Sequence, residues 1–320
     1  MSLSIAIIGY EEPLAEQLLT QLETAAVTLS DIHLLSVSDQ EETQTVRFQS
    51  KNLFVKPVED FDWHSADVIY LVGNSPEYVG LIQENKLQAY KLIDLRNSAM
   101  KDKSLPIYSE TAESISHVVC ADDTAALLSK IIAPLFEETA IQSINLVSLQ
   151  PVSATSHKGP EGLASEIARL MNGRPLENEE GQVQKAFNTV PTTDTERFFD
   201  ELKQIFPQEN LSGAVTTIEV PVFFGATLVV DFDLEDPLPK QTLLDLITQY
   251  EGVELSEAQL TPITHGSNQD NAFMTFSSPD TDEIQRFRLL IVADLPKCGR
   301  LKDALAITEF FEANNQSIQH

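Results

Sequence analysis

A thiol and two carboxylates lie close together in this sequence, and their side-chain types could support covalent or acid–base chemistry. Cys120 precedes the adjacent Asp122 and Asp123, and Thr124 opens a segment of helical periodicity. An ionised cysteine is a strong nucleophile, and carboxylates act as acid and base in hydrolases or line a ligand-binding cleft. The alternative is structural, because free cysteine behaves as a small apolar residue and an aspartate before a helix is a preferred N-cap.

A second candidate site is the turn in which Gly9 is followed by Glu11, Glu12 and Pro13. Dinucleotide-binding domains open with a strand, a glycine turn and a helix, whose N-terminal N–H groups and dipole attract phosphate. Here two carboxylates lie where a pyrophosphate would approach, and their own negative charges would interact favourably with the N-terminal end of the helix dipole. Pro13 suits the first helical turn, because the donor it lacks would be spare there. The turn therefore predicts a well-capped helix start, with Gly9 as the one remaining glycine of a cofactor loop.

The remaining candidates are basic or metal-binding residues. Arg96 and Lys101 flank a Ser-Ala pair and either attract phosphate or lie exposed to solvent. His157 lies in a polar loop, where a lone histidine is usually a solvated surface residue. Cys120 and Cys298 are far apart, which excludes a disulfide framework and a zinc spacing, so no metal site is predicted.

The elements that must position these residues alternate between strands and helices in the first half of the chain. Short apolar runs predict strands, and apolar residues at helical spacing predict helices. The predicted strands cover 4–9, 32–37, 66–73 and 91–95, with a hairpin-like stretch at 46–58, and the predicted helices cover 13–26, 77–87 and 124–136. Such alternation is typical of a parallel sheet that is covered by helices.

The second half of the chain has a different pattern, with a larger share of β structure. It is predicted to contain a strand at 144–152, helices at 161–171, 195–206 and 240–250, an acidic loop at 177–184, a long β stretch at 214–234 broken near Pro221 and Gly225, strands at 273–276 and 287–292, and a final helix at 301–313. The predicted fold class is therefore α/β. It combines an N-terminal doubly wound domain with an α+β second domain and a helix at the end of the chain.

Charge narrows the range of partners. The chain of 320 residues carries 49 acidic and 21 basic side chains, a formal net charge of −28. A field of this sign repels phosphate backbones and anionic lipid heads, so neither nucleic acid nor a membrane is expected as a partner. The acidity serves solubility or attracts a cationic protein. Residues 1–4 lack the basic start of a signal peptide and the apolar run at 5–9 is too short to span a bilayer, so a cytoplasmic location is expected.

Several segments follow one another in the order of the motifs of a known family. They are Leu92-Ile93-Asp94 with Arg96-Asn97-Ser98-Ala99, residues 124–135, residues 146–163, Asn172-Gly173, Ala186-Phe187-Asn188 with Pro191, Val220-Pro221-Val222, and residues 292–295 with Gly299 and Ala304-Leu305. Together they resemble the aspartate-semialdehyde dehydrogenase family over nearly the whole chain. The resemblance implies a Rossmann-like domain of residues 1–122 and 297–320, and a dimerisation domain of residues 123–296 that forms a homodimer.

The reaction that this resemblance implies is the reductive dephosphorylation of an acyl phosphate by a nicotinamide cofactor, through a thioester on cysteine. The family's nucleophile falls on Asp123, its substrate arginine on Glu219 and its histidine on Ala226, so that of its site residues only the glutamine, Gln150, is retained. Glutamate inverts the charge that would hold a substrate carboxylate, and alanine transfers no proton. A shift of three residues would instead place Cys120 at the nucleophile position. The glycines that follow the glutamine are replaced by Ala154 and Ser156, whose side chains narrow the site.

Three functions follow from these residues. The first is a degenerate (Usg-type) paralogue, a pseudoenzyme that forms a homodimer, takes no cofactor and has a structural or regulatory role through an unknown protein partner. The second is a functional NADP-dependent aspartate-semialdehyde dehydrogenase of amino-acid biosynthesis with an atypical site, using Cys120. The third is a repurposed small-ligand-binding module or hydrolase in which Asp122 and Asp123 line the old cleft.

Overall fold

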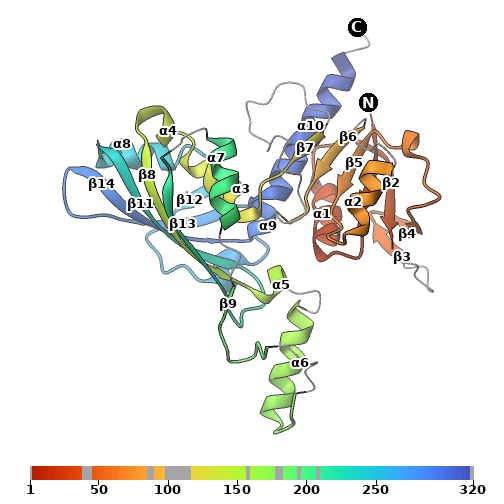
Figure 1. Cartoon of the computed structure of the whole chain (residues 1–320), viewed down its shortest axis with the longest axis horizontal. Helices are drawn as coiled ribbons and strands as arrows, with labels where there is room; N and C mark the ends of the chain where they lie inside the picture. The colour runs from red at the N-terminus through yellow and green to blue at the C-terminus, as the bar shows by residue number, and fades with distance from the viewer. Residues whose placement is uncertain are drawn as a thin grey trace. The chain divides into compact units, whose positions relative to one another are not determined.

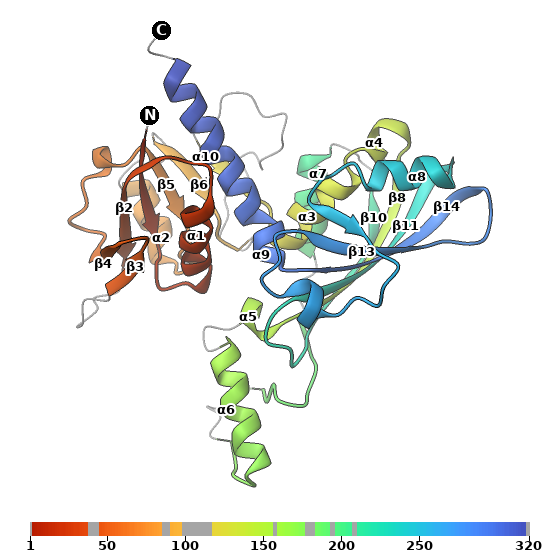
Figure 2. The same cartoon turned by 180° about the vertical axis from the view of Figure 1, so that it is seen from behind.

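The computed structural model describes residues 2–37, 45–84, 90–97, 117–155, 159–176, 183–192, 196–206 and 210–317. It divides into two compact units (Figures 1 and 2), of which unit 1 comprises residues 1–126 with 299–320 and unit 2 comprises residues 127–298. Each unit has its own seven-stranded sheet and is described by itself.

The sheet of unit 1 has the strand order of a doubly wound domain. Its order is β3-β4-β2-β1-β5-β6-β7, and all neighbours are parallel except the hairpin of β3 and β4. The strands are β1 (Leu3–Ile8), β2 (Leu29–Ser36), β3 (Thr45–Phe48), β4 (Lys51–Pro57), β5 (Val68–Leu71), β6 (Lys91–Asp94) and β7 (His117–Val119). The chain leaves β1 toward β2 and later returns to its other side with β5, so the strand order reverses at β1.

Helices cover both faces of this sheet. They are α1 (Pro13–Thr24), the short 3₁₀ helix η1 (Trp63–Ser65), α2 (Glu77–Glu84) and α10 (Arg300–Ser317). Helix α1 buries Leu18 and Leu22 in a cluster that also holds Leu301 and Ile307 of α10. The buried hydroxyls of Tyr70 in β5 and Thr308 in α10 are hydrogen-bonded. The predicted doubly wound domain and the return of the C-terminal helix to it are therefore confirmed.

Unit 2 contains a mixed sheet of the order β12-β13-β14-β11-β8-β10-β9. Its strands are β8 (Ile141–Gln150), β9 (Val190–Thr192), β10 (Ser212–Glu219), β11 (Ala226–Pro239), β12 (Val253–Leu255), β13 (Ala272–Ser277) and β14 (Glu283–Ala293). Its helices are α3 (Asp123–Ile132), which begins in unit 1, α4 (Leu135–Glu138), α5 (Val152–Thr155), α6 (Gly159–Met171), α7 (Glu196–Ile205), α8 (Lys240–Ile247), the π-helix η4 (Pro262–Gly266) and α9 (Leu295–Cys298). The predicted α+β character of this part is confirmed.

The structure differs from the predicted elements in one helix and in the shortest strands. The predicted helix at 124–136 is interrupted after Ile132, because Pro134 has no N–H to donate to the preceding turn. The predicted β stretch at 214–234, with its break near Pro221 and Gly225, is confirmed as β10 and β11. These two strands pair with opposite edges of β8, the first parallel and the second antiparallel. Strands of three residues, β7, β9 and β12, were not predicted, because three residues are too few to show a period.

Candidate functional site

The carboxyl edge of the unit 1 sheet at β1 and β5, where the strand order reverses, is the place where doubly wound folds bind ligands. Here the ring of Tyr78, from α2, lies over that position and is 0% exposed. A Cβ on Gly73 would lie 2.0 Å from the ring, and a Cβ on Gly9 would lie 2.2 Å from the backbone nitrogen of Gly73. The two glycines thus let the turns after β1 and β5 pack directly against each other and against the aromatic ring.

The hydroxyl of Tyr78 joins three segments at this edge. It donates to the carboxylate of Glu11, in the turn after β1, and accepts a hydrogen bond of 3.4 Å from the N–H of Val37, after β2. Burial raises the pKa of Tyr78, and the adjacent Glu11 carboxylate adds to this effect. The second oxygen of that carboxylate, Oε2, is buried and makes no hydrogen bond to the described part of the chain. A negative charge therefore lies where a dinucleotide phosphate would need donors.

Glu12 occupies the N-cap position of α1, but its side chain makes no capping hydrogen bond. Its Oε1 instead accepts the N–H of Asn74, after β5, at 3.1 Å. The side-chain Oδ1 of Asn74 in turn accepts the N–H of Asn97, after β6, at 2.9 Å. The prediction that the carboxylates cap the helix is thus wrong for Glu12, because its side chain accepts a hydrogen bond from the turn after β5 instead. The prediction of Pro13 at the helix start is confirmed.

Because of Tyr10, in the same turn, we expect the stability of the folded protein to fall at alkaline pH. Burial raises its pKa from 10.0 to about 12, and the charge of Glu16 adds to the shift. Because the folded state retains the phenolic proton, this stability is fully present below pH 10.0 and is lost as pH rises toward about 12. Tyr10→Phe keeps the ring, so between pH 10.0 and 12 the variant should lose about 1 kcal/mol less per pH unit than the unchanged protein in urea unfolding. Equal losses in both proteins at high pH would contradict this assignment.

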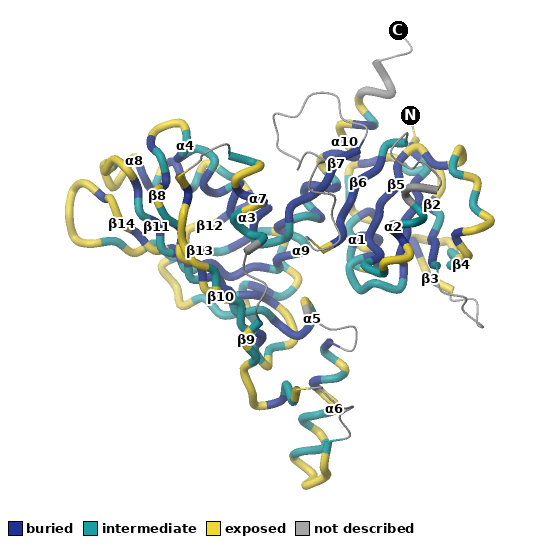
Figure 3. The backbone as a smooth tube through the Cα atoms, viewed as in Figure 1, coloured by how far each residue is buried: buried dark blue, intermediate teal, exposed yellow. Residues whose placement is uncertain are grey.

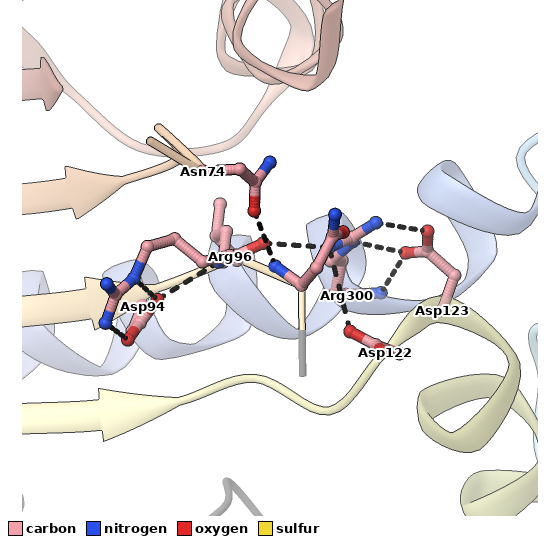
Figure 4. A network of polar contacts seen from close by, with 8 residues as sticks. Asn74, Asp94, Arg96, Asp122, Asp123 and Arg300 are labelled. Atoms are coloured by element: carbon pink, nitrogen blue, oxygen red, sulfur yellow. Dashed lines mark hydrogen bonds and ion pairs between the residues drawn. The ribbon is translucent and has the colours of Figure 1, made fainter. Parts of the chain in front are cut away.

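Asp94 and Arg96 form a buried ion pair at the end of β6 (Figure 4). The guanidinium Nε and Nη2 donate to the two carboxylate oxygens at 3.0 and 2.8 Å, and the arginine side chain is 3% exposed. The prediction of a solvent-exposed Arg96 is wrong, because this side chain is buried and Asp94 neutralises it inside the unit, whereas phosphate binding at Arg96 stays a prediction. Lys101, the other predicted phosphate contact, lies outside the described residues, as do Ser98 and Ala99.

Asp123, at the family's nucleophile position, is held by a second arginine (Figure 4). Arg300, at the start of α10, donates from Nε to Oδ1 at 3.0 Å and from Nη2 to Oδ2 at 2.9 Å. Its Nη1 donates to the carbonyl of Leu95 at 2.8 Å and lies 3.9 Å from Asp122. Both side chains of the Asp123–Arg300 pair are 13% exposed. The carboxylate therefore joins the C-terminal helix to the end of β7, and the arginine satisfies both of its oxygens.

Cys120 follows β7 and is 0% exposed within the apolar cluster of unit 1. Its backbone N–H donates to the carbonyl of Asp94 at 3.0 Å. Burial in apolar surroundings disfavours the thiolate, which is the reactive form. The position of Cys120 thus agrees with a packing role for this side chain.

Gln150, Glu219 and Ala226, the other family positions, lie in unit 2. The amide of Gln150 donates to the hydroxyl of Ser148 on the same strand at 2.6 Å. The carboxylate of Glu219 is buried and lies 2.8 Å from the Nζ of Lys185. Ala226 begins β11 and is 1% exposed.

The predicted glycine replacements and nearby residues are only partly described. Ala154 is exposed in α5, whereas Ser156 and His157 lie outside the described residues. The sequence motifs predict no site role for Lys185, Arg300, Tyr78 or Asn74. A signal for Lys185 was present, since a glutamate at a former arginine position needs a cation when it is buried.

Two features are absent from the described ranges: a membrane-spanning helix and a cluster of metal-binding side chains. None of their helices is long and apolar enough to cross a membrane. Nor do they bring together three or more histidine, cysteine, aspartate or glutamate side chains in an arrangement that could hold a metal ion.

Comparison with known proteins identifies relatives over nearly the full length. Residues 132–275 match the family described as semialdehyde dehydrogenase, dimerisation domain. Aspartate-semialdehyde dehydrogenase 2 of Vibrio cholerae is 25% identical, with 96% of each chain covered, and a USG-1 protein homologue of Haemophilus influenzae is 27% identical, with 84% of each covered. The crystal structure of aspartate semialdehyde dehydrogenase II from Vibrio cholerae has the same fold, with a TM-score of 0.86 at 23% identity over 98% of this chain and 99% of that one. Residues 132–275 thus match the semialdehyde dehydrogenase dimerisation domain, and the chain as a whole is similar in sequence to aspartate-semialdehyde dehydrogenases and USG-1 protein homologues.

Proposed function

We propose that this protein is a non-catalytic member of its family, with a structural or regulatory role through protein contacts. The observation that carries the proposal is the carboxyl edge of the unit 1 sheet, where Tyr78 fills the place of a dinucleotide and joins Glu11 to Val37. On this proposal residues 1–122 and 297–320 form a Rossmann-like domain without a cofactor. Residues 123–296 form the dimerisation domain of a homodimer, in line with the family match to residues 132–275.

The dinucleotide that the fold family implies does not fit these residues. Phosphate binding at a helix N-terminus needs free N–H groups and no competing anion. Here the carboxylates of Glu11 and Glu12 lie in that turn, and Gly9 and Gly73 are in backbone contact, so that no gap separates the two turns. The pyrophosphate would meet two negative charges and an aromatic ring.

The reacting groups are also absent from the positions that the family motif assigns. Acyl transfer through a thioester needs a thiolate, whereas Asp123 is neutralised by Arg300 and Cys120 is fully buried. A substrate carboxylate needs a cation, whereas the arginine position holds Glu219, which pairs with Lys185. These contacts support the proposal, because Asp123 and Glu219 each pair with a cation of their own unit.

An active NADP-dependent dehydrogenase is the second candidate, favoured by the relatives that carry that name. It would need Cys120 as the nucleophile and a rearrangement of Tyr78 to admit the cofactor. The third function, a hydrolase or ligand-binding module built on Asp122 and Asp123, has no support in the geometry, because Arg300 engages both carboxylates.

The test is a titration of NADPH and NADP into the purified protein, followed by calorimetry and by melting temperature. We expect no saturable binding up to about 1 mM and no rise in melting temperature, because a ligand that binds the native state stabilises it. NADP reduction with aspartate semialdehyde and phosphate should stay at the level of the blank. The dehydrogenase of Vibrio cholerae is the positive control in the same assays. Micromolar cofactor binding, or turnover that Cys120→Ser abolishes, would favour the dehydrogenase instead.

A further inference from the structure

The hairpin of β3 and β4 in unit 1 carries a local excess of positive charge. Residues 43–58 contain three basic side chains, Arg47, Lys51 and Lys56, and no acidic one, although the whole chain has 49 acidic and 21 basic residues. All three residues are exposed, and within the described ranges none of them forms an ion pair. Arg300, by contrast, is paired with an aspartate. The three cations of the hairpin are therefore available to an anion from outside the chain.

The register of the hairpin places two of these cations on the same face as a phenylalanine. Arg47 pairs with Asn52 across the antiparallel ladder, and Phe54 and Lys56 follow Asn52 at intervals of two residues. Because residues two apart on a strand point to the same side, Arg47, Phe54 and Lys56 share one face, here called the outer face. The opposite face carries the side chains that pack against the apolar cluster of unit 1, which are Val46, Leu53 and Val55.

The outer face is accessible, and the aromatic residue on it, Phe54, is 52% exposed. No residue of β4 and only Phe48 of β3 is buried (Figure 3). The hairpin forms one edge of its sheet, with β3 as the outermost strand (Figure 1). The outer face thus combines an exposed aromatic ring with an arginine and a lysine. Aromatic and arginine side chains are enriched among the residues that contribute most of the binding energy of protein interfaces.

We propose that the outer face binds an acidic segment of a protein partner, in which carboxylates flank an apolar side chain. In this complex the apolar side chain lies against the ring of Phe54. The guanidinium of Arg47 donates to one carboxylate in the bidentate geometry that its planar shape favours, and Lys56 attracts a second carboxylate. The inference rests on the proposed function, because it describes the protein partner of that function by charge and by contact surface.

The charges around the hairpin favour a short acidic segment over nucleic acid or an anionic membrane. Glu59 and Asp60 are exposed directly after the hairpin, and the whole chain has a formal net charge of −28. At physiological ionic strength the field of an exposed charge decays over about 8 Å, so a segment that contacts only the hairpin interacts mainly with its cations. A nucleic-acid strand carries one charge about every 3.4 Å, and like a membrane surface it would extend from the hairpin over negative charge.

The test is the fluorescence anisotropy of a labelled synthetic peptide that carries one leucine among glutamates, titrated with the full-length protein. We expect a dissociation constant of about 100 μM at an ionic strength of about 0.15 M, where the net charge of the chain is screened. The same peptide with glutamine in place of every glutamate should bind at least about tenfold more weakly, because the cations of the outer face then lose their partners.

Two variants with the same change in net charge locate the binding surface. Arg47→Glu, Lys56→Glu should weaken the binding of the acidic peptide at least about tenfold, because it reverses both charges of the outer face. The matched control, Lys203→Glu, Lys240→Glu, reverses two exposed lysines of unit 2 and should leave the affinity within about twofold. The melting temperature of each variant shows whether it is folded.

A third variant, Phe54→Ser, tests the apolar contact without a change of charge. It should weaken the binding of the acidic peptide at least about fivefold, because the leucine of the peptide loses the ring. The side chain is 52% exposed, so its replacement should leave the protein folded. This variant also decides the question if the charge-reversed hairpin does not fold. Unchanged affinity of Phe54→Ser would exclude the outer face as the binding surface.

The remaining outcomes separate this inference from the proposed function. If the unchanged protein shows no saturable binding of the acidic peptide up to about 1 mM, the inference is wrong and the cations only protect the sheet edge from aggregation. Equal weakening by the two charge reversals, or tighter binding of oligothymidine or of phosphatidylserine vesicles than of the peptide, would also refute it. Each of these results leaves the non-catalytic proposal intact when NADP does not bind. NADP turnover together with peptide binding at the outer face would instead refute the non-catalytic role and keep the surface.

Discussion

Tyr78→Ala is expected to lower the free energy of unfolding by about 3–5 kcal/mol, the cost of removing a fully buried aromatic side chain and leaving a cavity. The ring is 0% exposed and lies against Gly73, where backbone on both sides limits the collapse of the cavity. Tyr78→Phe keeps the ring and should cost about 1–3 kcal/mol, because the buried carboxylate of Glu11 loses its donor. Urea unfolding measures both values.

The Tyr78→Ala variant also tests whether the protein can bind NADP once the ring is removed. Opening the crevice by Tyr78→Ala should still give no NADP binding, since Glu11 and Glu12 keep their charges in the turn. If Tyr78→Ala lowered the free energy of unfolding by less than about 1 kcal/mol, Tyr78 would not fill a packed site. A variant that gained micromolar affinity for NADP would show that the tyrosine alone blocks a working cofactor site.

Asp123→Cys, which places a thiol at the family's nucleophile position, is expected to destabilise the protein and to give no dehydrogenase turnover. Arg300 would lose both carboxylate oxygens that it contacts at 2.9 and 3.0 Å while remaining 13% exposed. Leaving one partner of a largely buried pair uncompensated costs about 3–5 kcal/mol, and the residual exposure reduces this to about 2–4 kcal/mol. Turnover stays absent because no cofactor binds.

Two matched variants check this explanation. Asp122→Asn should cost under about 1 kcal/mol, because that carboxylate is 37% exposed and lies 3.9 Å from the guanidinium. Replacing Arg300 with leucine in the Asp123→Cys background should recover part of the loss, since the stranded charge is gone. Equal losses for Asp122→Asn and Asp123→Cys would contradict the role of the bidentate pair, and NADP reduction by Asp123→Cys would contradict the non-catalytic proposal.

Local sequence determined the order and type of the longer elements. Apolar spacing from Leu14 to Leu22 requires a helix, and short apolar runs at β1 and β5 require buried strands, because these periods follow from backbone geometry. The sequence pattern also predicted the mixed architecture of the two parts, and the family resemblance predicted the return of the final helix. The resemblance to the family motifs assigns the nucleophile, arginine and histidine positions to Asp123, Glu219 and Ala226, and this assignment stays a prediction.

Only the tertiary structure decided what these positions contact. Asp123 and Arg300 are 177 residues apart and meet because the C-terminal helix returns beside the end of β7. Tyr78 reaches Glu11 across 67 residues because β1 and β5 are neighbours in the sheet. The sequence predicts Arg96 to be exposed or to bind phosphate, because a sequence shows charge and not burial. Its partner Asp94 is only two residues away, but the packing of the sheet is what makes the pair inaccessible to solvent. Periodicity depends on neighbouring residues, whereas ion pairs and filled crevices depend on which segments the folded sheet brings together.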